Sequence, residues 1–201
     1  MQTRTFAFGA IGAFAFAATA SATVITFSQQ SVWSAYVAFQ SLTVVTEDFN
    51  SIPDGFHASG LSSSAGGIAW TATAAGDLFA QGGLLSTNNP TSLIFQFSPG
   101  VQAVAGNFFG TDINFNAVPS LVQVTLADGT STILLASGPA DFSGFFSTGS
   151  AISSLSITAA GAGTVFPTVD NLYFAVPIPA PGAAALLGLA AVATRRRRDV
   201  A

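Results

Sequence analysis

The chain contains no cysteine and no lysine, and it has a single histidine among its 201 residues. Without cysteine there is no disulfide framework, and one histidine alone excludes the usual zinc sites. Charged residues make up only 7% of the chain, whereas an average globular protein has roughly 25%. The solubility of this protein therefore depends on uncharged polar residues and glycine.

Positive charge is absent from the whole central region. The five arginines are Arg4 and, near the other end, Arg195, Arg196, Arg197 and Arg198. Eight of the nine acids lie between residues 23 and 176, at Glu47, Asp48, Asp54, Asp77, Asp112, Asp128, Asp141 and Asp170. A region with this charge cannot neutralise phosphates, which excludes nucleic acid as a partner. It attracts cations instead, including calcium.

Residues 1–22 have the three parts of a secretory signal peptide. Arg4 provides a positive start, an apolar run over residues 6–18 follows, and Ala20 and Ala22 form an A-x-A cleavage site before Thr23. The alternative is an uncleaved membrane helix, but a helix of this length rises only about 20 Å, against about 30 Å of hydrocarbon in a bilayer. We therefore predict cleavage before Thr23. The absence of an Arg-Arg pair here favours the general export route.

The other end has a different three-part pattern. Pro177, Pro179 and Pro181 predict a stiff, extended spacer, because proline fits neither a regular helix nor a central strand. An apolar run over residues 182–194 follows, and the four arginines come next. By the positive-inside rule these arginines stay in the cytoplasm, which places the rest of the protein outside. The apolar run is too short and too rich in alanine and glycine for a permanent anchor.

A proline motif, a short hydrophobic helix and a terminal arginine cluster resemble the PEP-CTERM sorting signal, the bacterial tail that exosortase recognises. Here the resemblance covers residues 176–201, and the usual Pro-Glu-Pro is replaced by Pro177-Ile178-Pro179, followed by Ala180-Pro181-Gly182. The resemblance implies export, brief anchoring in the inner membrane, and transfer by exosortase to the cell surface or the extracellular polysaccharide matrix. The sequence thus divides into a signal peptide (1–22), a body (23–175) and a sorting segment (176–201).

The body has one predicted helix, over residues 28–41. Ser28 or Ser31 is the expected N-cap. Apolar side chains recur at helical spacing at Val32, Tyr36 and Phe39, with Trp33 and Val37 beside them.

In the rest of the body, apolar runs separated by turn residues predict short strands. These strands cover residues 43–49, 66–74, 92–98, 101–110, 141–148, 152–158 and 169–176, with a hairpin over residues 120–137 that turns at Asp128-Gly129. No fixed repeat period is present. The pattern predicts an all-β fold, an antiparallel β-sandwich of jelly-roll-like type with one short N-terminal helix. The body is also similar to other PEP-CTERM ectodomains, through Glu47-Asp48-Phe49, Phe108-Phe109, Gly144-Phe145-Phe146 and the closing residues 170–174.

Four oxygen-bearing residues are candidates for a calcium site. Glu47 and Asp48 end an early strand, and Asp170 and Asn171 lie in the last strand. First and last strands are neighbours in many jelly rolls, which would bring these hard oxygen ligands together. The alternative is that all four are solvated residues of turns and edges. A second run, Asp112 to Asn116, has the start of a calcium loop but lacks its later glycine and acid, so we interpret it as a chance match.

The body contains no convincing catalytic set. His57 lies in a predicted loop, and no G-x-S-x-G motif accompanies it. The acids are scattered over turns and offer no specific pair for glycoside hydrolysis. Trp70 and Tyr173 are candidates for stacking on sugars, but Trp70 shares a strand face with Ile68 and Ala72, which is typical of a core residue.

The sequence therefore predicts an exported, exosortase-sorted cell-surface or matrix protein with a non-catalytic body that serves structure, adhesion or exopolysaccharide association. The expected partners are exosortase, the general export machinery and, transiently, the inner membrane, with polysaccharide as a further partner. The alternative is a carbohydrate-binding module with a structural calcium ion, and a surface hydrolase comes third.

Overall fold

The computed structural model describes residues 23–177. The predicted signal residues Ala20 and Ala22, and the sorting residues from Pro179, Pro181 and Gly182 to the four arginines, lie outside the described residues. Within residues 23–177 no helix has the length and hydrophobicity needed to cross a bilayer.

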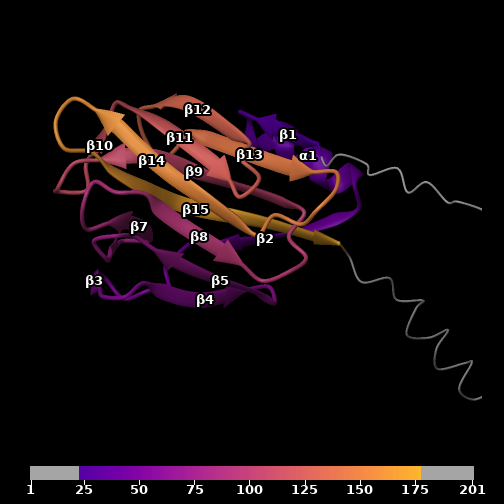
Figure 1. Cartoon of the computed structure of the whole chain (residues 1–201), viewed down its shortest axis with the longest axis horizontal. Helices are drawn as coiled ribbons and strands as arrows, with labels where there is room; N and C mark the ends of the chain where they lie inside the picture. The colour runs from indigo at the N-terminus through magenta and orange to yellow at the C-terminus, as the bar shows by residue number, and fades with distance from the viewer. Residues whose placement is uncertain (1–22, 178–201) are drawn as a thin grey trace, which may run out of the picture.

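The described chain forms two antiparallel sheets and one helix (Figure 1). The larger sheet has the strand order β1 (Val24–Phe27), β13 (Phe142–Ser147), β9 (Ala103–Thr111), β15 (Phe166–Pro177), β7 (Leu84–Thr87), β6 (Leu78–Gln81) and β3 (Gly55–His57). Two further strands, β2 (Leu42–Glu47) and β10 (Ala117–Val118), pair with β15 and β9. The smaller sheet has the order β12 (Ser131–Ala136), β11 (Ser120–Leu126), β14 (Ser154–Gly161), β8 (Leu93–Phe97), β5 (Ile68–Thr73) and β4 (Leu61–Ala65).

The main hydrophobic core lies between the two sheets. Along each strand the side chains alternate between the inner face, which meets the other sheet, and the outer face. In β5 this alternation buries Trp70, whose ring lies 5.8 Å from that of Phe95. Across the two sheets, the ring of Phe97 meets the ring of Phe174 edge-on at 5.3 Å. Apolar burial between the layers thus holds the sheets face to face.

The predicted all-β class, with its two antiparallel sheets and one helix, is confirmed. Each predicted strand corresponds to a strand of the structure, and the hairpin of β11 and β12 pairs from Ser120–Ala136 to Thr125–Ser131 as its alternation indicates. Six strands were not predicted, namely β1, β3, β4, β6, β7 and β10.

The helix α1 (Gln30–Phe39) lies on the outer face of the larger sheet. Its N-cap is Gln29, which makes no side-chain capping bond, so the prediction of a serine cap is wrong. Only Trp33 and Val37 are fully buried, whereas Phe39 is 81% exposed. The helix packs on the sheet through Trp33 and Val37, with Tyr36 half-buried against Phe146, so its buried face is narrower than the predicted apolar face.

The last strand, β15, organises the larger sheet. It pairs with β9 along one edge, while its other edge pairs first with β7 and then with β2. A register shift between Val169 and Leu172 marks a bulge, where the partner on the second edge also changes. The strand continues to Pro177, which pairs with Leu42, so the body extends two residues beyond its predicted end at 175.

Gly144 in β13 makes room for the helix. A Cβ placed on Gly144 would lie 2.7 Å from Cδ1 of Trp33, and the indole Nε1 of Trp33 donates to the Phe145 carbonyl at 3.2 Å. We predict that Gly144→Ala displaces the indole and lowers the free energy of unfolding by about 1–3 kcal/mol. Gly138→Ala is the matched control, because its Cβ would meet nothing closer than 3.9 Å. Urea denaturation measures both variants, and equal stabilities would contradict this packing argument.

Candidate functional site

The predicted calcium residues are near one another in the sheet, but Glu47 is committed to the core. Glu47 pairs with Leu172 across β2 and β15, and it is only 6% exposed. Its Oε1 accepts the backbone N–H of Phe49 at 3.0 Å, and its Oε2 accepts the indole N–H of Trp70 at 2.9 Å. Both oxygens are therefore occupied inside the protein, and Glu47 is not available as a metal ligand.

Asp48 and Asp170 are near enough for the charge of Asp48 to act on Asp170. Hydrogen bonds from Asn50 lower the pKa of Asp48. Partial burial, and next the negative charge of Asp48, raise the pKa of Asp170. Asp170 and Asn171 both occupy the bulge of β15. Among residues 23–177 no three His, Cys, Asp or Glu side chains come close enough to hold a metal ion, so Glu47, Asp48 and Asp170 do not form a cluster of three carboxylates.

The two predicted sugar-stacking residues both take part in packing. Trp70 is 2% exposed, and its ring lies in the core against Phe49 and Phe95. Tyr173 lies half-buried near Trp33, its ring 6.1 Å from the indole, and partial burial raises the pKa of its hydroxyl. The buried ring of Trp70 therefore offers no open face to a sugar, whereas Tyr173 is partly exposed and its stacking role stays a prediction.

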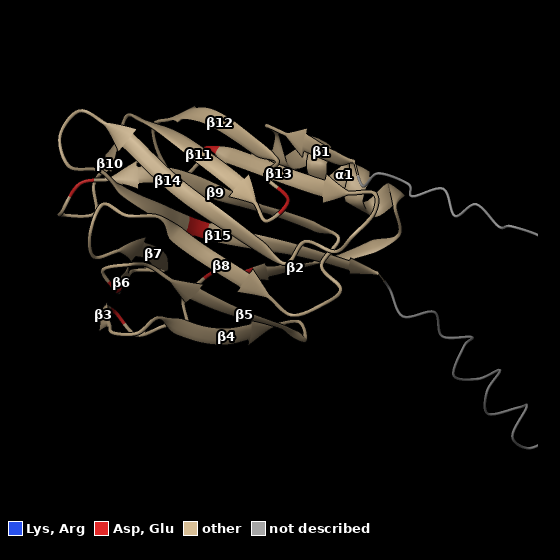
Figure 2. Cartoon of the chain, viewed as in Figure 1, with Lys and Arg blue, Asp and Glu red and all other residues tan. Residues whose placement is uncertain are grey.

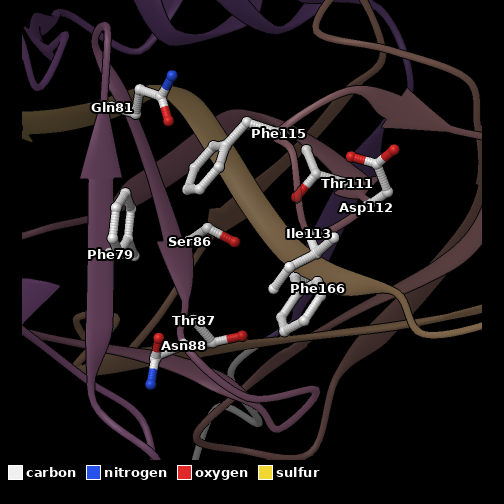
Figure 3. A pocket seen from close by; sticks show the side chains of 10 residues that line it. All are labelled: Phe79, Gln81, Ser86, Thr87, Asn88, Thr111, Asp112, Ile113, Phe115 and Phe166. Atoms are coloured by element: carbon white, nitrogen blue, oxygen red, sulfur yellow. The ribbon is translucent and has the colours of Figure 1, made fainter. Parts of the chain in front are cut away.

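A different site lies on the outer face of the larger sheet, at the end of β15 remote from α1. Here a pocket of about 130 Å³ forms between the β6–β7 hairpin, the end of β9 and the start of β15 (Figure 3). A second hollow, near Asp128, is larger at about 270 Å³ but is lined by small aliphatic and serine side chains without an aromatic ring. The first pocket is therefore the better candidate for specific binding.

Aromatic rings form two walls of the pocket. Phe79 and Phe115 lie on one side with their ring centroids 5.3 Å apart, and Phe166 and Ile113 lie on the other side (Figure 3). Phe79 faces outward because its neighbours Leu78 and Ala80 point into the core. Ile113 is 73% exposed and forms part of the rim. The pocket thus offers apolar surface that the main core does not use.

Hydroxyl groups line the space between these walls. The Thr168 hydroxyl bonds to those of Thr111 and Ser86, each at 2.8 Å, and Ser86 also donates to the Pro167 carbonyl. Thr87 is different: it is 3% exposed, and its Oγ1 has no hydrogen-bond partner among residues 23–177. A buried hydroxyl without a partner is costly and needs an explanation.

The turn from β9 to β10 is held by Asp112. Its carboxylate accepts the backbone N–H groups of Asn114 and Asn116 and the side-chain amide of Asn116, and these bonds lower its pKa. The same turn places Phe115 at a φ of +63°, which is strained for a side chain of this size. The carboxylate points away from the pocket in Figure 3. This run therefore organises a turn.

This pocket was not predicted from the sequence, because the β6–β7 hairpin that forms part of it was not predicted. The signal was present: Gly82 and Gly83, with φ values of +58° and +80°, join two short apolar runs. A Gly-Gly pair between such runs is a typical two-residue hairpin turn. His57, by contrast, lies outside the pocket, with its Nε2 2.9 Å from the Pro53 carbonyl oxygen.

The acids of the described chain are dispersed. Figure 2 shows them mainly in turns and at strand ends, with Asp170 in the middle of β15 and no arginine or lysine among the described residues. The pocket therefore has no cation to attract an anionic ligand.

Comparison with protein-family models and with curated proteins found no match to this chain.

Asp170 makes stability depend on pH. Since its pKa is raised above the ordinary value of 3.8, the folded protein holds this proton more tightly than the unfolded chain. The resulting stability is present below the unfolded pKa and is lost as pH rises through the folded pKa. We predict that Asp170→Asn raises Tm at pH 7 by about 1–2 °C, allowing for solvent screening, and that this gain disappears at about pH 3. Asp128→Asn is the control, and an equal gain there would contradict the argument.

The hydroxyls of the pocket give a second prediction. Thr168→Val leaves the hydroxyls of Thr111 and Ser86 without this partner, and should lower the free energy of unfolding by about 1–3 kcal/mol. Thr87→Val removes a hydroxyl that has no protein partner, and should leave stability unchanged or slightly raised. Urea denaturation of the two variants checks the contrast. A larger loss for Thr87→Val than for Thr168→Val would refute the assigned bonding.

Proposed function

We propose that the chain is an exported, exosortase-sorted bacterial surface or matrix protein with a non-catalytic β-sandwich body. The observation that carries the proposal is the order of motifs at the end of the chain: Pro177, Pro179 and Pro181, the apolar run, and then four arginines. The last strand of the sheet ends at Pro177. The first two residues of the predicted sorting segment, Val176 and Pro177, are therefore part of the fold.

The placement of the two ends supports this proposal. Thr23, the expected mature start, hydrogen-bonds to Thr148 beside β1. Pro177 ends β15 on the same side of the molecule, where α1 and β1 lie (Figure 1). Processing at either end would leave both sheets intact.

We further propose that the sandwich is jelly-roll-like. The strands of the second half alternate between sheets: β8 lies in the smaller sheet, β9 in the larger, β11 and β12 in the smaller, β13 in the larger, β14 in the smaller and β15 in the larger. Such repeated crossing between layers is typical of Greek-key sandwiches and jelly rolls.

Within this proposal the body serves structure, adhesion or association with exopolysaccharide. The pocket on the outer face favours the second candidate, a carbohydrate-binding module, because it combines aromatic walls with hydroxyl groups. Among the described residues no third His, Cys, Asp or Glu side chain joins Asp48 and Asp170, so this candidate is proposed without the metal. A surface hydrolase remains third.

Removing the segment after Pro177 tests the sorting proposal. In a bacterium that encodes an exosortase, a chain ending at Pro177 keeps all of β15 and should be exported but released into the medium rather than retained at the surface. Cell fractionation with an antibody to the body measures the distribution. Replacing the four arginines by glutamine, with the apolar run kept, should also abolish retention, because the positive charge holds that end in the cytoplasm.

The full chain in an exosortase-deleted strain is the control, and it should accumulate in the inner membrane. Surface retention of the chain that ends at Pro177 would refute the sorting proposal.

A further inference from the structure

We infer that the outer face of α1 docks on the lipid bilayer that holds the anchored chain, with Phe39 as the side chain that enters the boundary between headgroups and acyl chains. The inference deepens the proposed function, and it rests on that proposal for the anchoring of the segment after Pro177.

The exposed stripe of α1 is apolar. Val32 is 51% exposed and Phe39 is 81% exposed, and Ala35 is exposed between them. Spacings of i, i+3 and i+7 place these three side chains on one side of the helix. The opposite side, at Trp33 and Val37, packs on the larger sheet. Since a surface helix usually turns charged and polar residues outward, a second apolar stripe indicates a second apolar partner.

Phe39 lies close to the point where the chain leaves the fold. Leu42, three residues later, pairs with Pro177 at the end of β15. Paired Cα atoms lie about 5 Å apart and three residues span at most about 11 Å, so the Cα atoms of Phe39 and Pro177 are within about 16 Å of each other. In Figure 1, α1, β1 and the end of β15 lie at the same end of the molecule.

The predicted anchor begins only a short distance further along the chain. The apolar run over residues 182–194 starts five residues after Pro177, and five residues span at most about 18 Å. When this run enters the bilayer, the exit end of the body is therefore held against the bilayer surface. Such a short connection makes docking an intramolecular event, so a few exposed apolar side chains suffice to favour it.

The distribution of charge favours the same orientation. Residues 23–46, which include β1 and α1, contain no acid, and Figure 2 shows none on these two elements. Asp128 comes near β1, in a hollow that it lines with Val24, but α1 contributes no residue to that hollow. A bilayer that contains anionic lipid repels carboxylates. The uncharged end of this acidic body is therefore the end that approaches it most easily.

Tryptophan fluorescence in vesicles tests the inference. The full chain with Phe39→Trp is reconstituted into vesicles of phosphatidylethanolamine and phosphatidylglycerol, with and without lipid brominated near the top of its acyl chains. Trp33 and Trp70 are buried in the protein, so the chain without the substitution gives the background signal. We expect the emission of the added indole to shift to shorter wavelength and to be quenched at least about twofold, because an interfacial helix lies roughly 5–10 Å into the headgroup boundary.

Ile113→Trp is the matched control. Ile113 is 73% exposed and follows β9, whose last residue, Thr111, pairs with Phe166 at the start of β15. Eleven steps of strand separate Phe166 from Pro177, a distance of roughly 35 Å. An indole at position 113 should therefore show neither the shift nor the quenching.

A second reporter measures what Phe39 contributes. Val32→Trp places an indole on the same stripe and should also be quenched. Adding Phe39→Ala to this variant should lower the docking equilibrium by about tenfold, because the burial of one aromatic side chain is lost, and quenching should fall accordingly. Adding Ile113→Ala instead should leave the quenching unchanged. Circular dichroism verifies that each variant is folded.

A vesicle-bound chain whose indole at position 39 is quenched no more than the indole at position 113 would overturn the inference and leave the sorting proposal intact. A spectral shift without quenching by brominated lipid, or one that grows with the ratio of protein to lipid, would mean that a second copy covers α1, and would also overturn it. A full chain that does not bind vesicles would sink the anchoring and this inference with it. Retention of the chain that ends at Pro177 contradicts the sorting proposal alone, so the two failures are distinguishable.

Discussion

The structure depends on one constraint: between residues 23 and 177 no side chain of lysine or arginine is present to pair with the acids. The carboxylates must therefore be stabilised by N–H donors. Glu47 shows this most clearly, because its buried carboxylate accepts the indole of Trp70 and the backbone of Phe49. These bonds join β2 to β5 across the two sheets. A polar group that would be unfavourable in the interior without partners thus links the layers through two hydrogen bonds.

The same constraint shapes the turns. Asp112 and Asp141 each accept two backbone N–H groups, and Asp54 and Asp77 each accept one from a distant segment. The acids therefore fix the conformation of loops. Binding residues are found disproportionately on loops that a rigid scaffold positions. Asp170 is the exception, because its carboxylate receives no such bond from a described residue, and the negative charge of Asp48 acts on it. Asp170 lies in the bulge of β15, so the sheet contains an unfavourable negative charge at this position.

Sequence patterns predicted the part of the fold whose side chains alternate strongly. Val122 and Val124 in β11 lie inward and Leu121 lies outward, as the period-two pattern requires. The pattern failed for β4, where three serines obscure the alternation, and for the helix face, where Phe39 proved exposed because α1 rests on the sheet along one stripe. The site was harder to predict, since it joins three segments far apart in the chain and depends on their pairing with β15.

The difference between Thr87 and Thr168 shows why such a site is invisible in a sequence. Both are buried threonines in strands of the larger sheet. Thr168 has two hydroxyl neighbours because β15 lies between β9 and β7, which bring Thr111 and Ser86 to its two sides. Thr87 ends β7 beyond the pairing with β15, which covers only Leu85 and Ser86, and its partner on β6 is the apolar Leu78, so no neighbouring hydroxyl is supplied. The orphaned hydroxyl is therefore a consequence of where the pairing stops, and the same end of pairing opens the pocket beside it.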